Sequence, residues 1–293
     1  MGGGWDSAAC RGRTWPKIRS AVRRSAPPRR TEAAMAVEFA IIGGSGLETA
    51  PAGESLAVAT PFGVVTLTRL RLGGRELLFL PRHGGSPRPL PHQVNSRAQI
   101  WALHAVGVRA TLALNACGGI RDDLLPGTLT PFDDWLDFTR DRPRTFAGSA
   151  DYGTDPERFH LDVSVPYCPT LRSCLDEAAA AAGVTLAAPS VYACVEGPRY
   201  ETPAEVRMIR QLGGDVVGMT GLPEAVLARE LGLCYAGLGI VGNRAAGLAA
   251  APLSHREVVA VVARCRAALD RLLLAMAARV PATWRCPRCP RPR

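Results

Sequence analysis

Between residues 38 and 280, short apolar runs of strand length alternate with longer segments whose apolar residues recur at the helical period. The runs expected to be strands are 38–44, 76–84, 110–119, 190–200, 215–221 and 234–243. The segments expected to be helices are 92–107, 170–183, 202–214, 223–232 and 254–280. Such an alternation is typical of an α/β fold with helices on both faces of a sheet. Because no repeat or linker interrupts it, the sequence predicts a single α/β domain.

The net charge of +9 lies almost entirely outside this segment. Residues 1–34 carry +6 and residues 284–293 carry +4, which leaves residues 35–283 at −1. A nucleic-acid-binding domain carries its basic residues on the folded body, so this distribution argues against that class. We expect residues 1–34 to be disordered or to precede a true start at Met35, with an Arg-rich transit peptide as the alternative. Residues 284–293 are expected to be a basic tail, and residues 35–283 the domain.

Several other classes are disfavoured by residue usage. No apolar run reaches the roughly 18 residues of a membrane span, so a soluble protein is expected. The nine cysteines lack the spacing of a disulfide framework, which favours reduced thiols and a cytoplasmic location. Cys286 and Cys289 form one CxxC motif, but no second cysteine pair lies at the spacing of a zinc ribbon, so no metal site is predicted. Lys17 is the only lysine, which excludes lysine mechanisms from residues 35–283.

Polar residues follow the ends of the predicted strands, where ligands bind in open α/β sheets. These residues are Ser45, Arg82, His83, Asn115, the stretch 196–201, Met219, Thr220 and Asn243. The turn at 43–46, Gly-Gly-Ser-Gly, lacks the third glycine and the downstream acid of a dinucleotide fingerprint. It offers N–H groups and a hydroxyl to an anion instead, and Arg82 has the planar fork that suits phosphate. We therefore expect a phosphate site without metal or lysine.

Each of these residues also has a plain structural interpretation. The glycine turn can be an ordinary tight turn, and Arg82 a solvated surface charge. His83 can be a satisfied core histidine, and Thr220 can cap the helix that follows it. These alternatives stay open at the level of the sequence.

Five motifs occur in order along residues 38–280. They are AIIGGSGLE, PRHG with PHQVNSRAQIWAL, LNACGGIR, VYACVEGPRYET and GDVVGMTGLPEAVLARELGLCYA. In this order they resemble the trimeric purine nucleoside phosphorylases, in the branch of the methylthioadenosine and methylthioinosine phosphorylases. The resemblance implies one α/β domain with a mixed central sheet, and a homotrimer with sites near subunit interfaces. It also implies metal-free attack of phosphate on C1′ of a purine nucleoside, with phosphate as a co-substrate and no cofactor.

The resemblance further implies roles for individual residues. Phosphate would be bound by Ser45, Arg82, His83, Thr220 and the backbone of Ala116, with Asn115 beside them. Substrate contacts would come from Tyr200, Glu201, Met219, Asn243, Arg244, Ala245 and His255, and from His160, which is lent across a subunit interface. Asn243 and His83 would act in catalysis. One departure is Asn115, since methylthioadenosine enzymes of this branch usually have a hydroxyl residue there.

Asn243 bears on the identity of the base. The family places an acidic residue at this position when the base carries a 6-amino group. An amide can donate to O6 and accept from a protonated N7, whereas a carboxylate only accepts, so Asn243 favours a 6-oxopurine. Glu201 agrees, because it can accept the N1–H that 6-oxopurines possess. A helix cap for Asn243 and dipole complementarity for Glu201 are the alternatives.

The 5′ substituent of the sugar is left open. His255 suits a 5′-hydroxyl, while His160 and the stretch NRAAG match the methylthio-type enzymes. We expect cleavage of inosine or guanosine to the free base and ribose 1-phosphate, a purine salvage reaction. S-methyl-5′-thioinosine is the alternative substrate. A nucleotide-dependent oxidoreductase and a nucleic-acid-binding protein are both disfavoured.

Overall fold

The computed structural model describes residues 37–47, 52–84, 88–149, 152–249, 252–287 and 289. All of them lie in one compact unit, Ala36–Arg293. The expected N-terminal tail, residues 1–34, lies outside the described residues. Within the described part of the chain, no helix combines the length and the apolar character that crossing a bilayer requires.

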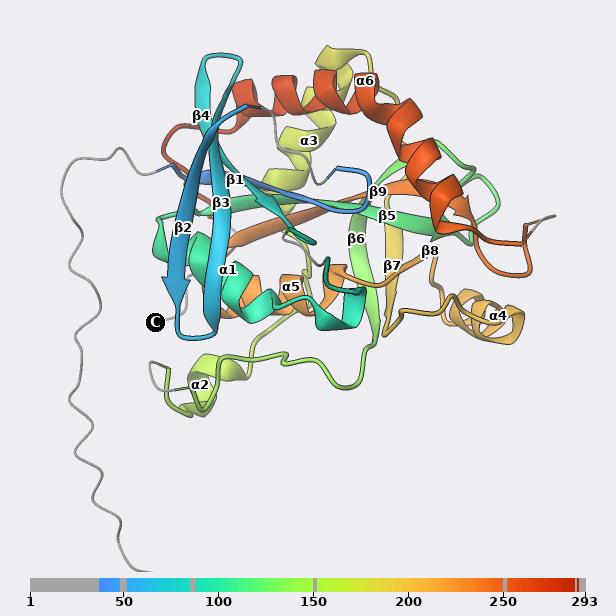
Figure 1. Cartoon of the computed structure of the whole chain (residues 1–293), viewed down its shortest axis with the longest axis horizontal. Helices are drawn as coiled ribbons and strands as arrows, with labels where there is room; N and C mark the ends of the chain where they lie inside the picture. The colour runs from blue at the N-terminus through green and yellow to red at the C-terminus, as the bar shows by residue number, and fades with distance from the viewer. Residues whose placement is uncertain are drawn as a thin grey trace, which may run out of the picture. The chain divides into compact units, whose positions relative to one another are not determined.

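A mixed sheet of nine strands forms the centre of the described unit (Figure 1). Its order is β2 (Glu54–Thr60), β3 (Gly63–Leu72), β4 (Arg75–Pro81), β1 (Phe39–Gly43), β5 (Ala110–Gly119), β8 (Val216–Gly218), β7 (Ser190–Val195), β6 (Leu129–Phe138) and β9 (Cys234–Arg244). Because β9 also pairs with β5, the last five strands close into a ring. The mixed sheet expected from the family resemblance is confirmed.

β5 is the strand around which the sheet is built. It runs parallel to β9 along its whole length, and its other edge pairs first with β1 and then, antiparallel, with β8. Its residues are almost all buried, which explains why it reads as a continuous apolar run. A bulge between Cys117 and Gly118 shifts the register near the end of the strand.

Helices cover both sides of the sheet. Figure 1 shows α3 (Pro169–Ala182) and α6 (His255–Arg279) on one side, and α1 (Ser96–Ala105) and α5 (Gly221–Glu230) on the other. The remaining helices are α4 (Pro203–Gln211), the short α2 (Pro156–Phe159) and the 3₁₀ turn η1 (Pro91–Gln93). α4 begins with a capping box, in which Thr202 and Glu205 each accept a backbone N–H of the other.

The predicted helices and strands are all present, but β2, β3, β6 and α2 were not predicted. β6 contains Pro131, and a proline within an apolar run argues against a strand. β7 and β8 end earlier than expected, at Val195 and Gly218. The carbonyls that follow are bound by the side chain of Arg142 rather than by a neighbouring strand.

The chain after α6 packs onto the domain. Trp284 is only 3% exposed, and its backbone N–H donates to the Glu38 carboxylate. Arg75 donates to the Pro281 carbonyl at 2.5 Å. Cys286 and Cys289 pack against the main apolar core. The described part of the expected C-terminal tail is therefore integral to the fold.

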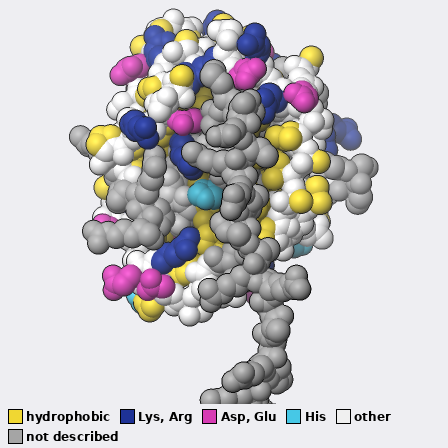
Figure 2. Space-filling model, turned by 90° about the vertical axis from the view of Figure 1, so that its left-hand side faces the viewer, with side chains coloured by type: hydrophobic (Ala, Val, Ile, Leu, Met, Phe, Trp, Pro, Cys, Tyr) yellow, Lys and Arg dark blue, Asp and Glu magenta, His cyan; other side chains and the backbone are white. Residues whose placement is uncertain are grey.

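The surface agrees with the near-zero charge of the domain. On the face that Figure 2 presents, outside the grey atoms, basic and acidic side chains are intermixed among apolar ones. Among the described side chains visible on this face, no continuous basic area would track a nucleic-acid backbone.

Candidate functional site

A cavity of about 440 Å³ lies where β1, β4, β5, β8 and β9 end. This is the edge at which α/β sheets bind ligands, and the volume suits a small molecule. The predicted site residues that line it are Ser45, Arg82, His83, Ala116, Tyr200, Glu201, Met219, Thr220, Asn243 and His255. Segments as far apart in the sequence as Ser45 and His255 thus meet in one place.

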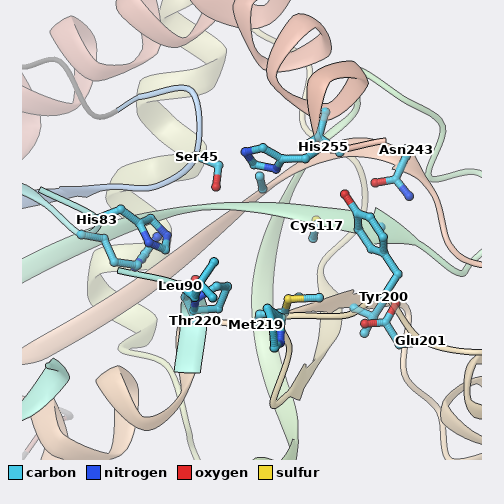
Figure 3. Close-up of a pocket in the computed structure, with 18 of the residues that line it drawn as sticks. Ser45, His83, Leu90, Cys117, Tyr200, Glu201, Met219, Thr220, Asn243 and His255 are labelled. Carbon is cyan, nitrogen blue, oxygen red and sulfur yellow. The ribbon is translucent and has the colours of Figure 1, made fainter. Parts of the chain in front are cut away.

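The cavity has two polar ends (Figure 3). Ser45, His83 and Thr220 lie toward one end, and Tyr200, Glu201 and Asn243 toward the other. Met219 and Cys117 lie between the two groups. One end carries hydroxyl and imidazole groups, and the other an amide and a carboxylate, so the cavity suits an elongated ligand with two chemically different ends.

Arg82 also lines the cavity, adjoins His83 in the chain, lies against Gly44 beside Ser45, and is 1% exposed. Its Nε and Nη2 donate to the Glu224 carboxylate at 2.5 and 3.0 Å, and Nη1 donates to the Leu114 carbonyl at 2.8 Å. A guanidinium has five N–H donors, so two remain for a ligand. Burial alone would lower the pKa of Arg82, but Glu224 more than offsets this and the pKa is raised. Arg82 is thus a permanently charged group and not a solvated surface charge.

Gly44 makes room for this guanidinium. A Cβ at position 44 would lie 2.6 Å from Arg82 Nη1 and 2.9 Å from the Leu114 carbonyl oxygen. Glycine in the turn after β1 is therefore required by the close approach of Arg82, whatever the turn itself binds.

One hydrogen bond fixes the side chain of His83, and another fixes the backbone of Thr220. Nδ1 of His83 lies 3.1 Å from the Pro89 carbonyl, so this nitrogen carries the proton in that contact. Thr220 stands at the N-cap of α5, but its hydroxyl makes no capping bond. Instead, the Tyr192 hydroxyl accepts the N–H groups of Thr220 and Gly221, each at 3.2 Å. The helix-cap interpretation of Thr220 is therefore wrong.

Asn243 and Glu201 form the second end. Asn243 is 7% exposed, lies in β9 and precedes no helix, so the cap interpretation is wrong here too. Its Nδ2 donates to the Arg244 carbonyl at 2.6 Å, which leaves one amide N–H and the amide oxygen for a ligand. Glu201 is 9% exposed and precedes the capping residue of α4, outside its first turn. Burial raises the pKa of the Glu201 carboxyl.

Four predicted site residues do not line this cavity. Asn115 is buried and donates to the Ala113 carbonyl at 3.1 Å. Arg244 donates to the Arg121 carbonyl at 2.6 Å, and Ala245 packs in a separate apolar cluster. His160 is exposed just after α2. For Asn115, Arg244 and Ala245, the side chains are engaged elsewhere in the fold.

The structure adds residues that the sequence reasoning missed. Arg88, in a proline-rich loop, brings a second cation to the cavity lining, and Val258 brings an apolar group from α6. Arg142 lies outside the lining, but its guanidinium holds the strand ends together. It donates to the carbonyls of Met219 at 2.5 Å and Val195 at 3.3 Å, and also to that of Glu196. No local pattern marks a loop arginine whose partners are distant carbonyls.

Comparison with known proteins gives consistent matches. The phosphorylase superfamily model matches residues 38–278. A probable 6-oxopurine nucleoside phosphorylase of Moorella thermoacetica is 43% identical, over 86% of this chain and 96% of that protein. A probable S-methyl-5′-thioinosine phosphorylase of Methanosarcina acetivorans is 41% identical, over 87% and 95%. The solved methylthioadenosine phosphorylase of Schistosoma mansoni, in complex with adenine, is similar with a TM-score of 0.77 and 30% identity, over 83% and 91%.

Proposed function

The chain belongs to the phosphorylase superfamily, and we propose that it cleaves 6-oxopurine nucleosides with inorganic phosphate to give the free purine base and ribose 1-phosphate. The observation that carries the proposal is the pair of opposed ends in one cavity. Arg82 with two remaining donors marks one end, and Asn243 with Glu201 marks the other. A nucleoside between them presents C1′ toward the first end and the base toward the second.

At the first end, phosphate is bound by the charged Arg82 and the hydroxyls of Ser45 and Thr220, with His83 and the backbone of Ala116 beside them. Charge-assisted bonds from a buried guanidinium orient the nucleophile without a metal. A phosphate oxygen forms a bond to C1′ as the C1′–N9 bond breaks, and that electron pair moves into the purine. The proton of HPO₄²⁻ is released as the new bond forms, and the purine takes up one proton from solvent.

At the second end, the protein neutralises the charge that develops on the leaving purine. The Asn243 amide donates to O6 and accepts from protonated N7, and the Glu201 carboxylate accepts N1–H. Preorganised donors aimed at developing charge stabilise the transition state more than the substrate. This pairing matches hypoxanthine and guanine, whereas adenine offers no N1–H to Glu201.

A second candidate substrate is S-methyl-5′-thioinosine. Val258 lines the cavity one turn after His255 on α6, so the residue proposed to meet the 5′ group has an apolar neighbour. A histidine favours a 5′-hydroxyl, and a valine favours a methylthio group. A relative named as a 6-oxopurine nucleoside phosphorylase and one named as an S-methyl-5′-thioinosine phosphorylase match this chain at similar sequence identity.

The enzyme is further proposed to be a cytoplasmic homotrimer that needs no cofactor. His160 is exposed and stands outside the cavity of its own chain, which fits its proposed role at the site of a neighbouring subunit. Light scattering would give the mass of the assembly. A mass of one chain would contradict the trimer.

The deciding experiment is a phosphate-dependent assay of inosine, guanosine, adenosine, methylthioadenosine and methylthioinosine with one enzyme preparation. We expect the three 6-oxopurine nucleosides to be cleaved at least about 100-fold more efficiently than their 6-amino counterparts. Omitting phosphate should abolish turnover. Equal efficiency with inosine and adenosine, or turnover without phosphate, would overturn the proposal.

A further inference from the structure

Four cysteines meet away from the cavity. Cys168 and Cys234 are buried, Cys286 and Cys289 are half-buried, and all four Sγ atoms lie within 4.8 Å of one another. They come from three segments: the residue before α3, the first residue of β9, and the chain after α6. None of the four lines the cavity. The sequence has no second cysteine pair at the spacing of a zinc ribbon, but the fold places Cys168 and Cys234 next to the C-terminal CxxC.

We propose that Cys168, Cys234, Cys286 and Cys289 bind a structural Zn²⁺ ion. A tetrahedral zinc centre with Zn–S bonds of about 2.3 Å places its sulfur atoms about 3.8 Å apart. The Sγ atoms of Cys168 and Cys286 are 3.6 Å apart, and the whole set fits within 4.8 Å. A disulfide requires about 2.05 Å, so the cysteines are spaced as metal ligands and not as bonded pairs.

The surroundings suit thiolate ligands. The Leu171 N–H donates to Cys168 Sγ at 3.4 Å, at the N-terminus of a 14-residue helix whose dipole favours negative charge. The Thr170 hydroxyl lies 3.3 Å from Cys286 Sγ. Such contacts orient the ligands and stabilise their charge. A zinc ion with four thiolates carries a net charge of −2, and residues 284–293 carry four arginines and no acid, so the net charge of this segment is opposite in sign to that of the site.

The backbone already holds two of the ligands in place. The Cys168 N–H donates to the Tyr235 carbonyl at 2.9 Å, and the Cys234 N–H donates to the Arg109 carbonyl at 2.9 Å. The C-terminal segment brings the other two as it packs beside Trp284. With four protein ligands the metal has no open position for water, so its role is to fasten this segment to α3 and β9 and not to act on a substrate.

The test is the metal content of the full chain, purified under reducing conditions without added chelator or metal. We expect about one zinc per chain. Cys286→Ser should lower the zinc content at least about tenfold and lower the Tm by roughly 5–10 °C. The matched control is Cys174→Ser, on the same helix α3 but outside the cluster, which should keep both values. Cobalt supplied to the metal-free chain should give the visible absorption of a tetrahedral cobalt tetrathiolate, and Cys286→Ser should abolish it.

Several results would overturn the site. The first is a full chain that holds no zinc after purification under reducing conditions and takes up none when zinc is supplied. The second is a zinc content in Cys286→Ser equal to that of the unchanged chain. The third is a cobalt spectrum without the absorption of thiolate ligands. Mass spectrometry that finds disulfides among the four cysteines after reduced purification would do the same. If Cys286→Ser does not fold, the zinc and cobalt measurements on the unchanged chain still decide. Because none of these readouts uses a nucleoside, the site and the proposed reaction can fail separately.

Discussion

In the proposed function, the single side chain of Asn243 selects the base. It combines a donor and an acceptor, and its Nδ2 contact with the Arg244 carbonyl holds the amide in one orientation. A carboxylate in the same place keeps the shape but loses the donor. We therefore propose that a substitution at this one residue can change the base specificity.

We expect Asn243→Asp to lower kcat/KM for inosine by about 100-fold or more, because the carboxylate would face O6 as acceptor against acceptor. Adenosine should gain relative to inosine, since its 6-amino group can donate to the carboxylate. The switch should be partial, because adenine still offers Glu201 no N1–H. The measurement is kcat/KM for both nucleosides in the two proteins. A ratio that stays within a few-fold would remove Asn243 from base recognition.

Glu201 leads to a pH dependence. Burial raises the pKa of its carboxyl, so the group becomes protonated at a higher pH than an exposed glutamate as the pH falls. The protonated form is a weaker acceptor for N1–H of hypoxanthine because it has lost its charge, but it can donate to N1 of adenine. We expect kcat/KM for inosine to fall on the acid side with an apparent pKa above the ordinary value of about 4.3. The adenosine-to-inosine ratio should rise over the same range, and in Glu201→Gln this acid limb should be absent. Identical pH profiles in both proteins would show that another group titrates.

At the scale of elements, the site depends on how two strand ends are joined. β7 and β8 end where the Arg142 guanidinium donates to the carbonyls of Val195 and Met219. The segment after β8 places Met219 and Thr220 in the lining of the cavity. Gly197, with φ of +68°, allows the close approach of Met219, because a Cβ there would lie 2.6 Å from its sulfur. Arg142 does not line the cavity, and we propose that it acts as a positioning residue.

We expect Arg142→Lys to lower kcat/KM at least about 100-fold, because a single ammonium cannot span carbonyls on two strand ends. The matched control is Arg144→Lys, two residues away, whose exposed ion pair with Asp137 is 3.4 Å long and should contribute little. Both proteins should be assayed well below their Tm, with KM for nucleoside and for phosphate measured separately. A loss explained by Tm alone, with unchanged kinetics at low temperature, would make Arg142 purely structural.

At the scale of the whole molecule, the C-terminal segment extends the domain beyond the boundary at residue 283 that composition suggested. Trp284 is buried to 3% exposure, and Arg75 and Glu38, from far earlier in the chain, bond to this region. Cys286 and Cys289 also pack against the main apolar core. Net charge alone therefore does not mark where packing against the core ends.

A chain ended at residue 283 should lose at least about 3 kcal/mol of unfolding free energy, the cost of removing a buried aromatic side chain. A chain ended at residue 289 is the control, because it keeps Trp284 and both terminal cysteines. Denaturant unfolding of the two proteins should be compared with and without chelator, so that packing and metal binding are measured separately. Equal midpoints would show that residues 284–289 contribute nothing to the fold.

Sequence alone was enough for the features that act within a few residues. The buried run of β5 and the polar residues at strand ends were visible locally, because periodicity and turns are short-range. The resemblance then supplied the mixed sheet. The β2–β3 hairpin is local, but it escaped prediction because β2 is mostly exposed and does not read as an apolar run. β6 escaped because its partners β7 and β9 lie far along the chain and because it contains Pro131.

Only the tertiary structure decided which distant groups meet. It paired Arg82 with Glu224, 142 positions away, at the wall of the cavity. It brought Arg88 to the cavity and turned Arg244 away from it. It placed Cys168 beside Cys286, 118 positions apart, where the spacing of the cysteines had argued against a metal. The reason is physical: chain folding brings such groups together through long-range packing, and the sequence separation of two residues carries no information about that distance.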